Sequence, residues 1–434
     1  MRLLIKGGRV VDPGNGVNGI LDILVEDGVI GEVRRGIDAA EKGAKAIDAD
    51  GKTVVPGLVD MHVHLREPGY EHKETIETGC LAAVAGGFTT VACMANTLPV
   101  NDCASVTRLI VERAKAIGII DVLPVGALSK GLKGEDLVEF RPLKEAGAVA
   151  FCDDGNPVMD SGLMRSALES SRKLGLPILS HCEDLNLSRG GVMNEGELSG
   201  ELGVKGIPGA AEEVMIARDV ILADLTGGRV HICHVSTAGS VDLIRWAKAK
   251  GFPVTAETAP HYFTLTEEAV RDHGTNAKIN PPLRTPFDIE AIKEGLRDGT
   301  IDAVATDHAP HDATSKALDF LRAPSGIVGL ETALSLTLRL VDEGVLSLDG
   351  AIAKLSANPS RILGLSKGTL SKGSPADIAI FDENREFVLQ KTALRSKSRN
   401  TPFDGWRLRG LVELTIAGGR IVYQRGDYIG CQDA

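Results

Sequence analysis

The architecture of this chain can be read from the segment Val54-Val55-Pro56-Gly57-Leu58-Val59-Asp60-Met61-His62-Val63-His64-Leu65-Arg66. An apolar run ends in two histidines two residues apart, and an arginine follows two residues later. Residues i and i+2 of an extended strand share a face, so His62 and His64 point the same way. Paired imidazoles are ligands for a divalent transition metal, but they are equally ordinary polar residues at a strand end. Other ligands elsewhere in the chain must decide between the two interpretations.

Length and composition indicate a soluble globular protein with a large core and an accessory domain. The chain has 434 residues, of which 43% are hydrophobic and 25% are charged. Its net charge of −11 disfavours nucleic-acid binding, and an anionic substrate would need a local basic pocket. The seven cysteines are scattered without a CxxC pair, which is typical of reduced thiols in the cytoplasm. We expect neither a signal peptide nor a membrane span.

Short apolar strands alternate with helices from about residue 58 to residue 364. Such a pattern predicts a parallel sheet covered on both faces, and eight units predict a (β/α)8 barrel of the TIM type. An open doubly wound sheet is the alternative, but no GxGxxG follows the first strand. The predicted strands are Gly57–Val63, Phe88–Met94, Asp121–Val125, Ala148–Cys152, Pro177–Ser180, Val230–Cys233, Phe252–Ala256 and Ala303–Thr306. The predicted helices include Lys73–Ala85, Ser105–Ile117, Gly162–Leu174, Gly209–Leu225, Ser240–Lys250 and Asp288–Asp298.

Both ends of the chain have the character of strands and glycine turns. Val412–Tyr423, for example, predicts a hairpin with a Gly-Gly turn. Neither end is long enough to bury much surface alone, so we predict that residues 1–54 and 366–434 form one small β-sandwich domain. It would lie beside a metal-dependent hydrolase barrel of residues 55–365. Asn384–Arg409 is rich in arginine and lysine and is expected to be a solvated extension over the surface.

Histidine or aspartate ends five of the predicted strands. The carboxyl ends of parallel barrel strands all lie at the catalytic face, so these side chains are expected to meet. Five strands that each deliver a ligand to one face predict a metal centre. Imidazole and carboxylate groups suit zinc, and two-metal sites can share a bridging carboxylate and a hydroxide nucleophile. The candidate ligands are His62, His64, Asp153, Asp154, His181, His234 and Asp307.

Other candidates have plainer interpretations. His231 is three residues before His234, which places it on the opposite strand face as a polar packing residue. His261 follows the seventh predicted strand and could line the site, although direct ligation is not favoured. Cys182 and Cys233 flank ligand histidines, and alternation turns them toward buried packing.

The chain resembles the bacterial class I dihydroorotases of the amidohydrolase superfamily over nearly its whole length. The motifs that carry this resemblance are Asp60–Gly69, Met94–Thr97, Asp153–Gly155, Lys278–Arg284, Ala305–His311 and Gly326–Thr332. The resemblance implies reversible ring closure of N-carbamoyl-L-aspartate to L-dihydroorotate, a step of pyrimidine (UMP) biosynthesis.

The resemblance also implies two zinc ions per subunit. His62 and His64 would bind one zinc, His181 and His234 the second, and Asp154 with a hydroxide would bridge them; Asp153 is the alternative bridge. The hydroxide would attack the ring amide, while Asp307 would bind metal and carry the proton to the leaving nitrogen. Many relatives bridge their metals with a carboxylated lysine, whereas the fourth strand here ends in Asp-Asp. That departure argues against hydantoinases, dihydropyrimidinases and most allantoinases.

Substrate contacts are implied in the same way. Arg66 and Asn96 would bind the substrate carboxylate, and an arginine facing the metal site suits bidentate recognition of that group. Relatives usually have Pro-Phe-Gly where this chain has Pro324-Ser325-Gly326, so any packing by the aromatic ring is lost. The full implied set of substrate-binding residues is His64, Arg66, Asn96, Asn280, His311, Ser325 and Gly326.

We predict a cytoplasmic homodimer that binds neither nucleic acid nor membrane, with aspartate transcarbamoylase as a candidate partner. Two rival functions remain open. One is another cyclic amidohydrolase of the allantoinase type, against which Arg66 and Asn96 argue. The other is an inactive scaffold for aspartate transcarbamoylase, but such scaffolds lose metal ligands and this chain keeps them.

Overall fold

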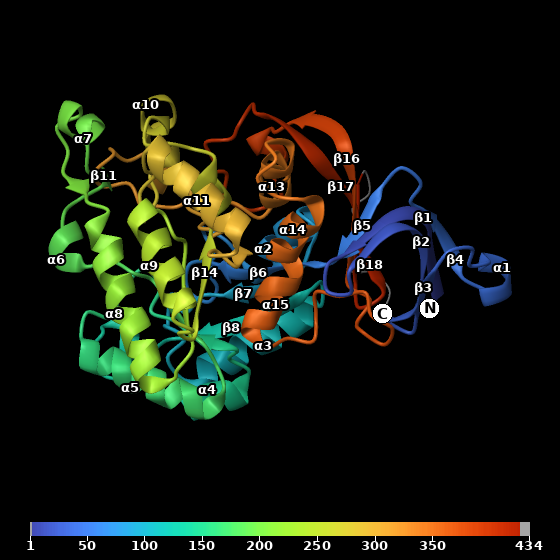
Figure 1. Cartoon of the computed structure of the whole chain (residues 1–434), viewed down its shortest axis with the longest axis horizontal. Helices are drawn as coiled ribbons and strands as arrows, with labels where there is room; N and C mark the ends of the chain where they lie inside the picture. The colour runs from blue at the N-terminus through green and yellow to red at the C-terminus, as the bar shows by residue number, and fades with distance from the viewer. Residues whose placement is uncertain (1, 426–434) are drawn as a thin grey trace.

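A parallel barrel forms the larger part of the structure, a computed structural model that describes residues 2–425 (Figure 1). Its strand order is β15-β14-β13-β10-β9-β8-β7-β6. The two edges meet where Val63 bridges His308 and the His64 amide donates to the His308 carbonyl at 2.8 Å. The predicted (β/α)8 barrel is therefore confirmed. Its strands are β6 (Leu58–Val63), β7 (Phe88–Cys93), β8 (Asp121–Gly126), β9 (Ala150–Phe151), β10 (Ile178–Ser180), β13 (Val230–Ile232), β14 (Val254–Thr258) and β15 (Ala303–Val304).

Helices surround the barrel, as Figure 1 shows. Side-chain caps fix where several of them begin, since a hydroxyl or carboxylate oxygen satisfies a free amide of the first turn. Thr75 caps the first barrel helix, α2, in this way. This helix therefore begins at Ile76 and not at the predicted Lys73. The main helices are α2 (Ile76–Ala85), α3 (Ala104–Ile117), α4 (Phe140–Ala146), α5 (Ser161–Leu174), α8 (Ala210–Thr226), α9 (Ala238–Ala249), α11 (Pro286–Asp298), α13 (Ala333–Asp342), α14 (Leu348–Ile352) and α15 (Asn358–Leu363).

Shorter elements decorate the connections between the barrel strands. β11 and β12 pair in parallel as a small two-stranded sheet. Within residues 2–425, no helix is long and apolar enough to cross a membrane. The short elements are α6 (Leu185–Ser188), β11 (Met193–Asn194), α7 (Glu197–Glu201), β12 (Gly206–Ile207), α10 (Ala269–His273) and α12 (Ala313–Lys316).

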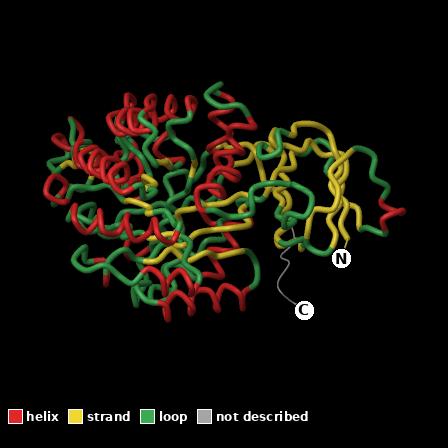
Figure 2. The backbone as a smooth tube through the Cα atoms, turned by 60° about the horizontal axis from the view of Figure 1, so that its bottom comes forward, coloured by secondary structure: helices red, strands yellow, loops and turns green. Residues whose placement is uncertain are grey.

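Strands from both ends of the chain build a separate sheet domain beside the barrel (Figure 2). They are linked in one path, β18-β17-β16-β5-β1-β2-β3, with β4 paired to β1. β5 joins the two ends, because it runs parallel to β1 and antiparallel to β16. The predicted separate domain built from both ends of the chain is confirmed as a sheet domain. Its sandwich form and the boundaries at residues 54 and 365 stay predictions. Its elements are β1 (Arg2–Asp12), β2 (Val17–Glu26), β3 (Val29–Arg34), α1 (Ala39–Lys42), β4 (Lys45–Asp48), β5 (Thr53–Pro56), β16 (Ile378–Val388), β17 (Arg407–Ala417) and β18 (Arg420–Gln424).

One prediction about the C-terminal part is wrong: Asn384–Arg409 is not a solvated extension. Its first residues continue β16, and its last begin β17. Between them the chain crosses the barrel with alternating burial, so that Leu394, Ser396, Ser398 and Asn400 are buried while the basic residues between them are exposed. The high content of basic residues led to the wrong prediction because these residues occupy only one side of the extended segment. The other side is buried although it is mostly polar.

The barrel and the sheet domain share an apolar contact layer. Phe381 of β16 and Val412 of β17 belong to the same buried cluster as Leu58 and Phe88 at the start of two barrel strands. The sheet domain thus packs directly on the end of the barrel opposite to the ends of its strands that carry the candidate ligands.

Replacing Phe88 tests that packing. Phe88 is fully buried, so Phe88→Ala should lower the free energy of unfolding by about 3–5 kcal/mol through lost burial and the cavity left behind. Phe287 is 76% exposed, and Phe287→Ala should change it by about 0.5 kcal/mol or less. Urea denaturation of the three proteins measures both values, and equal effects would contradict the assignment of Phe88 to the core.

Candidate metal centre and active site

A cavity of about 550 Å³ opens at the carboxyl ends of the barrel strands. Its volume lies within the usual range for a small-molecule site. All the predicted substrate-binding residues line it, as do several of the candidate ligands. These lining residues include His64, Arg66, Asn96, Asp154, His181, Asn280, Asp307, His311, Ser325 and Gly326.

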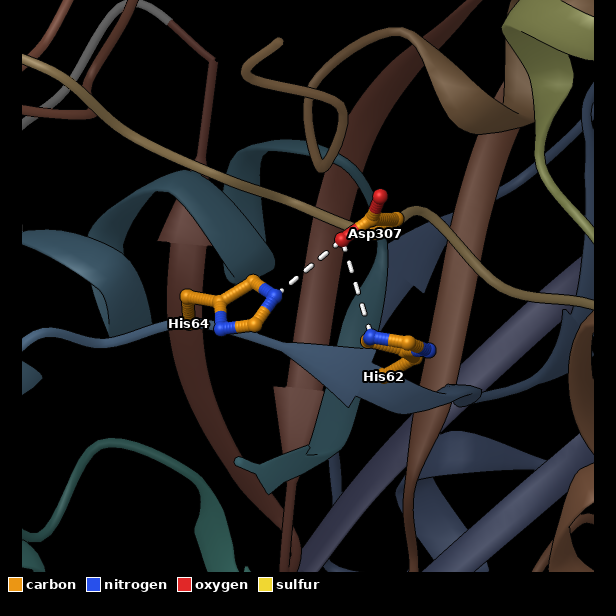
Figure 3. Close-up of side chains that lie close together, drawn as sticks. All are labelled: His62, His64 and Asp307. Atoms are coloured by element: carbon orange, nitrogen blue, oxygen red, sulfur yellow. Dashed lines mark hydrogen bonds and ion pairs between the residues drawn. The ribbon is translucent and has the colours of Figure 1, made fainter. Parts of the chain in front are cut away.

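The first half of the ligand cluster joins β6 to the end of β15. Asp307 places Oδ1 3.1 Å from Nε2 of His64 and 3.6 Å from Nε2 of His62. Figure 3 shows this oxygen between the two imidazoles, while the second carboxylate oxygen points away from them. Asp154 approaches from the opposite strand, with Oδ1 and Oδ2 each 3.3 Å from Nε2 of His62 and His64 respectively.

The second half brings β10 and β13 to the same carboxylate. Oδ1 of Asp154 lies 3.4 Å from Nδ1 of His181 and 3.4 Å from Nε2 of His234. Those two ring nitrogens face each other at 2.8 Å. Asp154 therefore lies between four imidazoles, and each imidazole turns one nitrogen toward it.

Hydrogen bonds on the far side of three rings determine which nitrogen faces inward. Nδ1 of His62 lies 2.7 Å from Glu257 Oε1, and Nδ1 of His64 lies 2.9 Å from Asn96 Oδ1. Nε2 of His181 lies 3.0 Å from Glu183 Oε2. Each outer partner is an oxygen that can only accept, so the outer nitrogen carries the proton and the inner nitrogen presents a lone pair.

The two neighbouring aspartates face different ways. Asp153 Oδ1 accepts from the backbone amides of Leu128 and Ser129 at 2.7 and 3.0 Å, and Oδ2 accepts from the Ser129 hydroxyl. Its carboxylate is thus used within the connection after β8. Asp154 is the one of the pair that points at the histidines.

The donor set fits a divalent metal. Nε2 of His62 and Oδ1 of Asp154 are buried, yet neither has a hydrogen-bond partner among residues 2–425. Buried lone pairs without a donor are costly unless a cation satisfies them. Clusters able to hold an ion are His62 with His64 and Asp307, and His62 with Asp154 and His234. Cys233 also lies nearby, but burial raises the pKa of its thiol well above its ordinary value, which disfavours the thiolate that metals bind.

Backbone strain is concentrated at the site. Arg66, His234 and Asp307 have φ of 62°, 35° and 46°, a region that residues with a side chain seldom adopt. Such conformations cost of order 1–3 kcal/mol each and persist where surrounding contacts impose them. Here all three residues come after barrel strands, where Arg66 and Asp307 line the cavity and His234 faces Asp154.

Local positive charge surrounds the cavity of this acidic chain. Arg66 and Lys278 line it, while burial and the nearby Lys278 lower the pKa of Lys316 to about 7, so that this third cation is only partly charged at neutral pH. Burial lowers the pKa of Arg66 to about 10, which leaves the guanidinium charged at neutral pH. The basic pocket that an anionic substrate would need is therefore present.

One wall of the cavity consists of His311 with the Ser325-Gly326 pair. His311 Nε2 lies 2.8 Å from the Ser325 carbonyl, so this nitrogen is the donor. Burial, with Arg66 and two lysines nearby, lowers the pKa of His311 to about 2, which keeps the ring neutral. Gly326 has φ of 146°, and a Cβ there would lie 2.7 Å from the Ala309 carbonyl oxygen and 2.9 Å from the His311 ring. Only glycine fits this close approach.

Sequence reasoning missed two carboxylates of the site. Glu257 lies inside β14 and contacts both His62 and His231, and hydrogen bonds from the two rings outweigh the effect of burial and lower its pKa to about 2. His231 is thus a buried polar residue, as predicted, and it also contacts the Glu257 carboxylate that bonds to His62. Glu183 contacts His181 and also accepts from the Asn280 amide at 2.8 Å. Its position two residues after His181 is the i, i+2 spacing that places both on one face of an extended chain.

His261 lies near enough to Asp307, His234 and His62 for their charges to influence its ring. Its Nε2 is buried and has no hydrogen-bond partner among residues 2–425, and burial lowers the pKa of its ring to about 4. His261 does not line the cavity described above either.

Comparisons with known proteins agree with this site. The family model described as "Dihydro-orotase-like" matches residues 51–240, and the one described as "Amidohydrolase family" matches residues 228–423. A dihydroorotase of Geobacter metallireducens is 56% identical over 425 residues, which cover 98% of this chain and 100% of that protein. A dihydroorotase of Syntrophus aciditrophicus is 54% identical over 424 residues with the same coverage.

Solved structures share the fold at lower identity. L-hydantoinase (dihydropyrimidinase) from Arthrobacter aurescens is 28% identical with a TM-score of 0.87, and the match covers 98% of this chain and 97% of that one. Dihydropyrimidinase from Brevibacillus agri NCHU1002 is 24% identical with a TM-score of 0.87 over 99% and 96% of the two chains, a likeness of fold alone. Relatives more than half identical over their full length, together with the ligand cluster in the barrel mouth, show that this chain belongs to the dihydroorotase family of the amidohydrolase superfamily.

Proposed function

We propose that the chain is a zinc-dependent dihydroorotase, which interconverts N-carbamoyl-L-aspartate and L-dihydroorotate in pyrimidine biosynthesis. One observation carries the proposal: a charged arginine, Arg66, lines the same cavity as His64, Asp154, His181 and Asp307, which belong to the cluster of four histidines and two aspartates. A metal cofactor is expected of this family. Zinc, two ions per subunit and Asp154 in place of a carboxylated lysine belong to the proposal, and the inward lone pairs of His62, His64 and His181 support it.

Substrate binding is assigned to the cavity wall. Arg66 suits the substrate carboxylate because a guanidinium can bind its two oxygens at once. Asn96 has its carbonyl oxygen occupied by His64, so its amide hydrogens remain for the substrate. Asn280 is restrained by Glu183 on one side of the cavity. His311, Ser325 and Gly326 complete the wall on the other side.

The chemical step requires a nucleophile and a proton carrier. Metal ions bound here would lower the pKa of a water molecule and polarise the ring carbonyl. Asp307 offers one oxygen to the His62 and His64 side and keeps the other turned away, so a single carboxylate can serve as a ligand and as a general base. In hydrolysis Asp307 accepts the proton of the attacking water and passes it to the ring nitrogen as the C–N bond breaks. Ring closure follows the same path in reverse.

The remaining sequence expectations stay predictions. A homodimer in the cytoplasm and association with aspartate transcarbamoylase belong to this group. The rival function as an inactive scaffold is disfavoured because every predicted ligand is present, and His62, His64, Asp154, His181, His234 and Asp307 all converge.

Activity and metal content measured together test the proposal. We expect about two zinc ions per subunit and hydrolysis of dihydroorotate that a chelator abolishes and added zinc restores. Allantoin and hydantoin serve as comparison substrates, since an allantoinase-like or hydantoinase-like enzyme would prefer one of them. Zinc-loaded protein that turns over neither dihydroorotate nor carbamoyl aspartate would contradict the proposal.

The bridging assignment can be tested on the two neighbouring aspartates. Asp154→Ala should reduce the bound zinc sharply and leave the fold intact, because it removes the carboxylate shared by four imidazoles. Asp153→Ala should keep the zinc but destabilise the protein by about 1–3 kcal/mol, since it leaves the Leu128 and Ser129 amides unpaired. Elemental analysis and thermal unfolding measure the two effects, and loss of zinc only in Asp153→Ala would reverse the assignment.

The proton-transfer role predicts a different pattern for Asp307. Asp307→Asn should retain zinc and lower kcat by about 10²–10⁴-fold, the usual contribution of a general base. The matched control is Asp242→Asn at an exposed residue of α9 that forms a salt bridge with Arg245, and it should behave as wild type. Near-normal turnover by zinc-loaded Asp307→Asn would rule out the shuttle.

A further inference from the structure

The cavity wall formed by His311 and Ser325-Gly326 is attached to a distant part of the chain. Asn400 belongs to the segment between β16 and β17, which leaves the sheet domain and contacts residues that follow the barrel strands β6 and β15. It is 4% exposed. Its carbonyl Oδ1 accepts from the His311 backbone amide at 3.0 Å, and its Nδ2 donates to the Ala309 and Gly326 carbonyls at 2.9 and 3.0 Å. Its own backbone carbonyl accepts from the Val328 amide at 3.0 Å.

These bonds join the two chain segments that make the wall. Ala309 and His311 follow β15, whereas Gly326 and Val328 lie beyond α12. The segments touch each other directly, since the Ala309 amide donates to the Ile327 carbonyl at 2.9 Å. Asn400 holds both at once through one acceptor and two donors, a combination that among side chains of this length only a primary amide supplies.

The rest of the segment is fixed elsewhere, which makes Asn400 its point of contact with the wall. Ser396 donates to Glu74, a carboxylate that also lies 3.3 Å from Nε2 of His308. Ser398 donates to the Lys73 carbonyl at 2.7 Å. These contacts secure the segment against the connection after β6, and the Arg395 and Ser396 amides donate to Glu331 beyond the wall at 2.7 and 3.1 Å. Among the described residues of the segment, Asn400 makes the hydrogen bonds to the wall itself.

We propose that Asn400 is a positioning residue for substrate binding, acting through the backbone of His311 and Gly326 without touching the substrate. The inference rests on the proposed function, because it assumes that this wall holds the substrate. Without the Asn400 side chain, the backbone N–H of His311 and the backbone carbonyls of Ala309 and Gly326 lose a buried partner. The two chain segments of the wall are then no longer held against each other by this side chain. Five of the six proposed metal ligands lie on or after other strands, and the sixth, Asp307, follows β15 ahead of Ala309 and is held by its own contacts with His62 and His64. Asn400 therefore affects binding of the substrate more than the chemical step.

The test compares Asn400→Ala with Ser398→Ala. Asn400→Ala should raise KM for dihydroorotate by about tenfold, the equivalent of one lost interaction of ordinary strength, with kcat within about threefold and zinc content unchanged. Ser398→Ala removes a buried hydrogen bond of the same segment that does not reach the wall, and it should leave KM unchanged. An equal rise of KM in Ser398→Ala, or an unchanged KM in Asn400→Ala, would overturn the proposal.

Backbone hydrogen exchange provides a readout that is independent of the substrate. In Asn400→Ala, amides of residues 309–328 should exchange faster, whereas those of residues 58–66 should not. If Asn400→Ala does not fold, Asn400→Asp keeps the size and the acceptor while losing both donors, and it should show the same local change. Unchanged exchange at 309–328 would overturn the positioning role. Failure of the wild-type protein to hydrolyse dihydroorotate would instead contradict the proposed function and leave this exchange result interpretable.

Discussion

The central constraint on this structure is the convergence of lone pairs on one point. Inner nitrogens of His62, His64, His181 and His234 face the Asp154 carboxylate at 3.3–3.4 Å. No donor from the described chain satisfies His62 Nε2 there, so the arrangement is stable only with a cation or with added protons. The barrel makes it feasible because parallel strands end at one face and each can supply one ligand from a rigid position. The outer partners Glu257, Asn96 and Glu183 then keep the rings from turning.

Hydrogen bonds also connect the proposed metal ligands to the residues proposed to bind the substrate. Asn96 links His64 to the substrate side of the cavity, and Glu183 links His181 to Asn280. The proposed metal site and the proposed substrate site are therefore connected by single side chains, Asn96 and Glu183. The sheet domain contributes as well, because the segment that leaves β16 reaches the opposite face of the barrel and secures the His311 wall. It is a structural part of the site and not a separate appendage.

Much of the fold and of the site could be predicted because the evidence for them is local. Most barrel strands are short and largely apolar, His62 lies near the end of β6, and His181 and Asp307 follow β10 and β15 closely. What could not be predicted depends on contacts between distant segments. The turn after β9 decides that Asp154 faces the histidines and Asp153 faces away from them. The sequence Asp-Asp alone does not predict which of the two carboxylates faces the histidines. Glu257 faces His62 across the barrel, which its own strand does not reveal. The role of Asn400 was not predicted because its segment is rich in basic residues and was therefore expected to be solvated. Arginine or lysine does alternate with serine or asparagine from Arg395 onward, and this alternation indicates an extended segment with one buried side.

The pairing of β5 with β16 has a consequence for how the protein is made. Synthesis proceeds from the N-terminus, and domains fold as their residues leave the ribosome. Thr53–Pro56 emerges early, but Ile378–Phe381, its partner strand, emerges only after the whole barrel has been translated. Until then the edge of β5 has unpaired backbone groups, the kind of edge on which chains associate wrongly. Asn400 emerges later still. A nascent chain can therefore contain every proposed metal ligand before Asn400 is available to bond the proposed substrate wall, which places completion of that wall late in biogenesis.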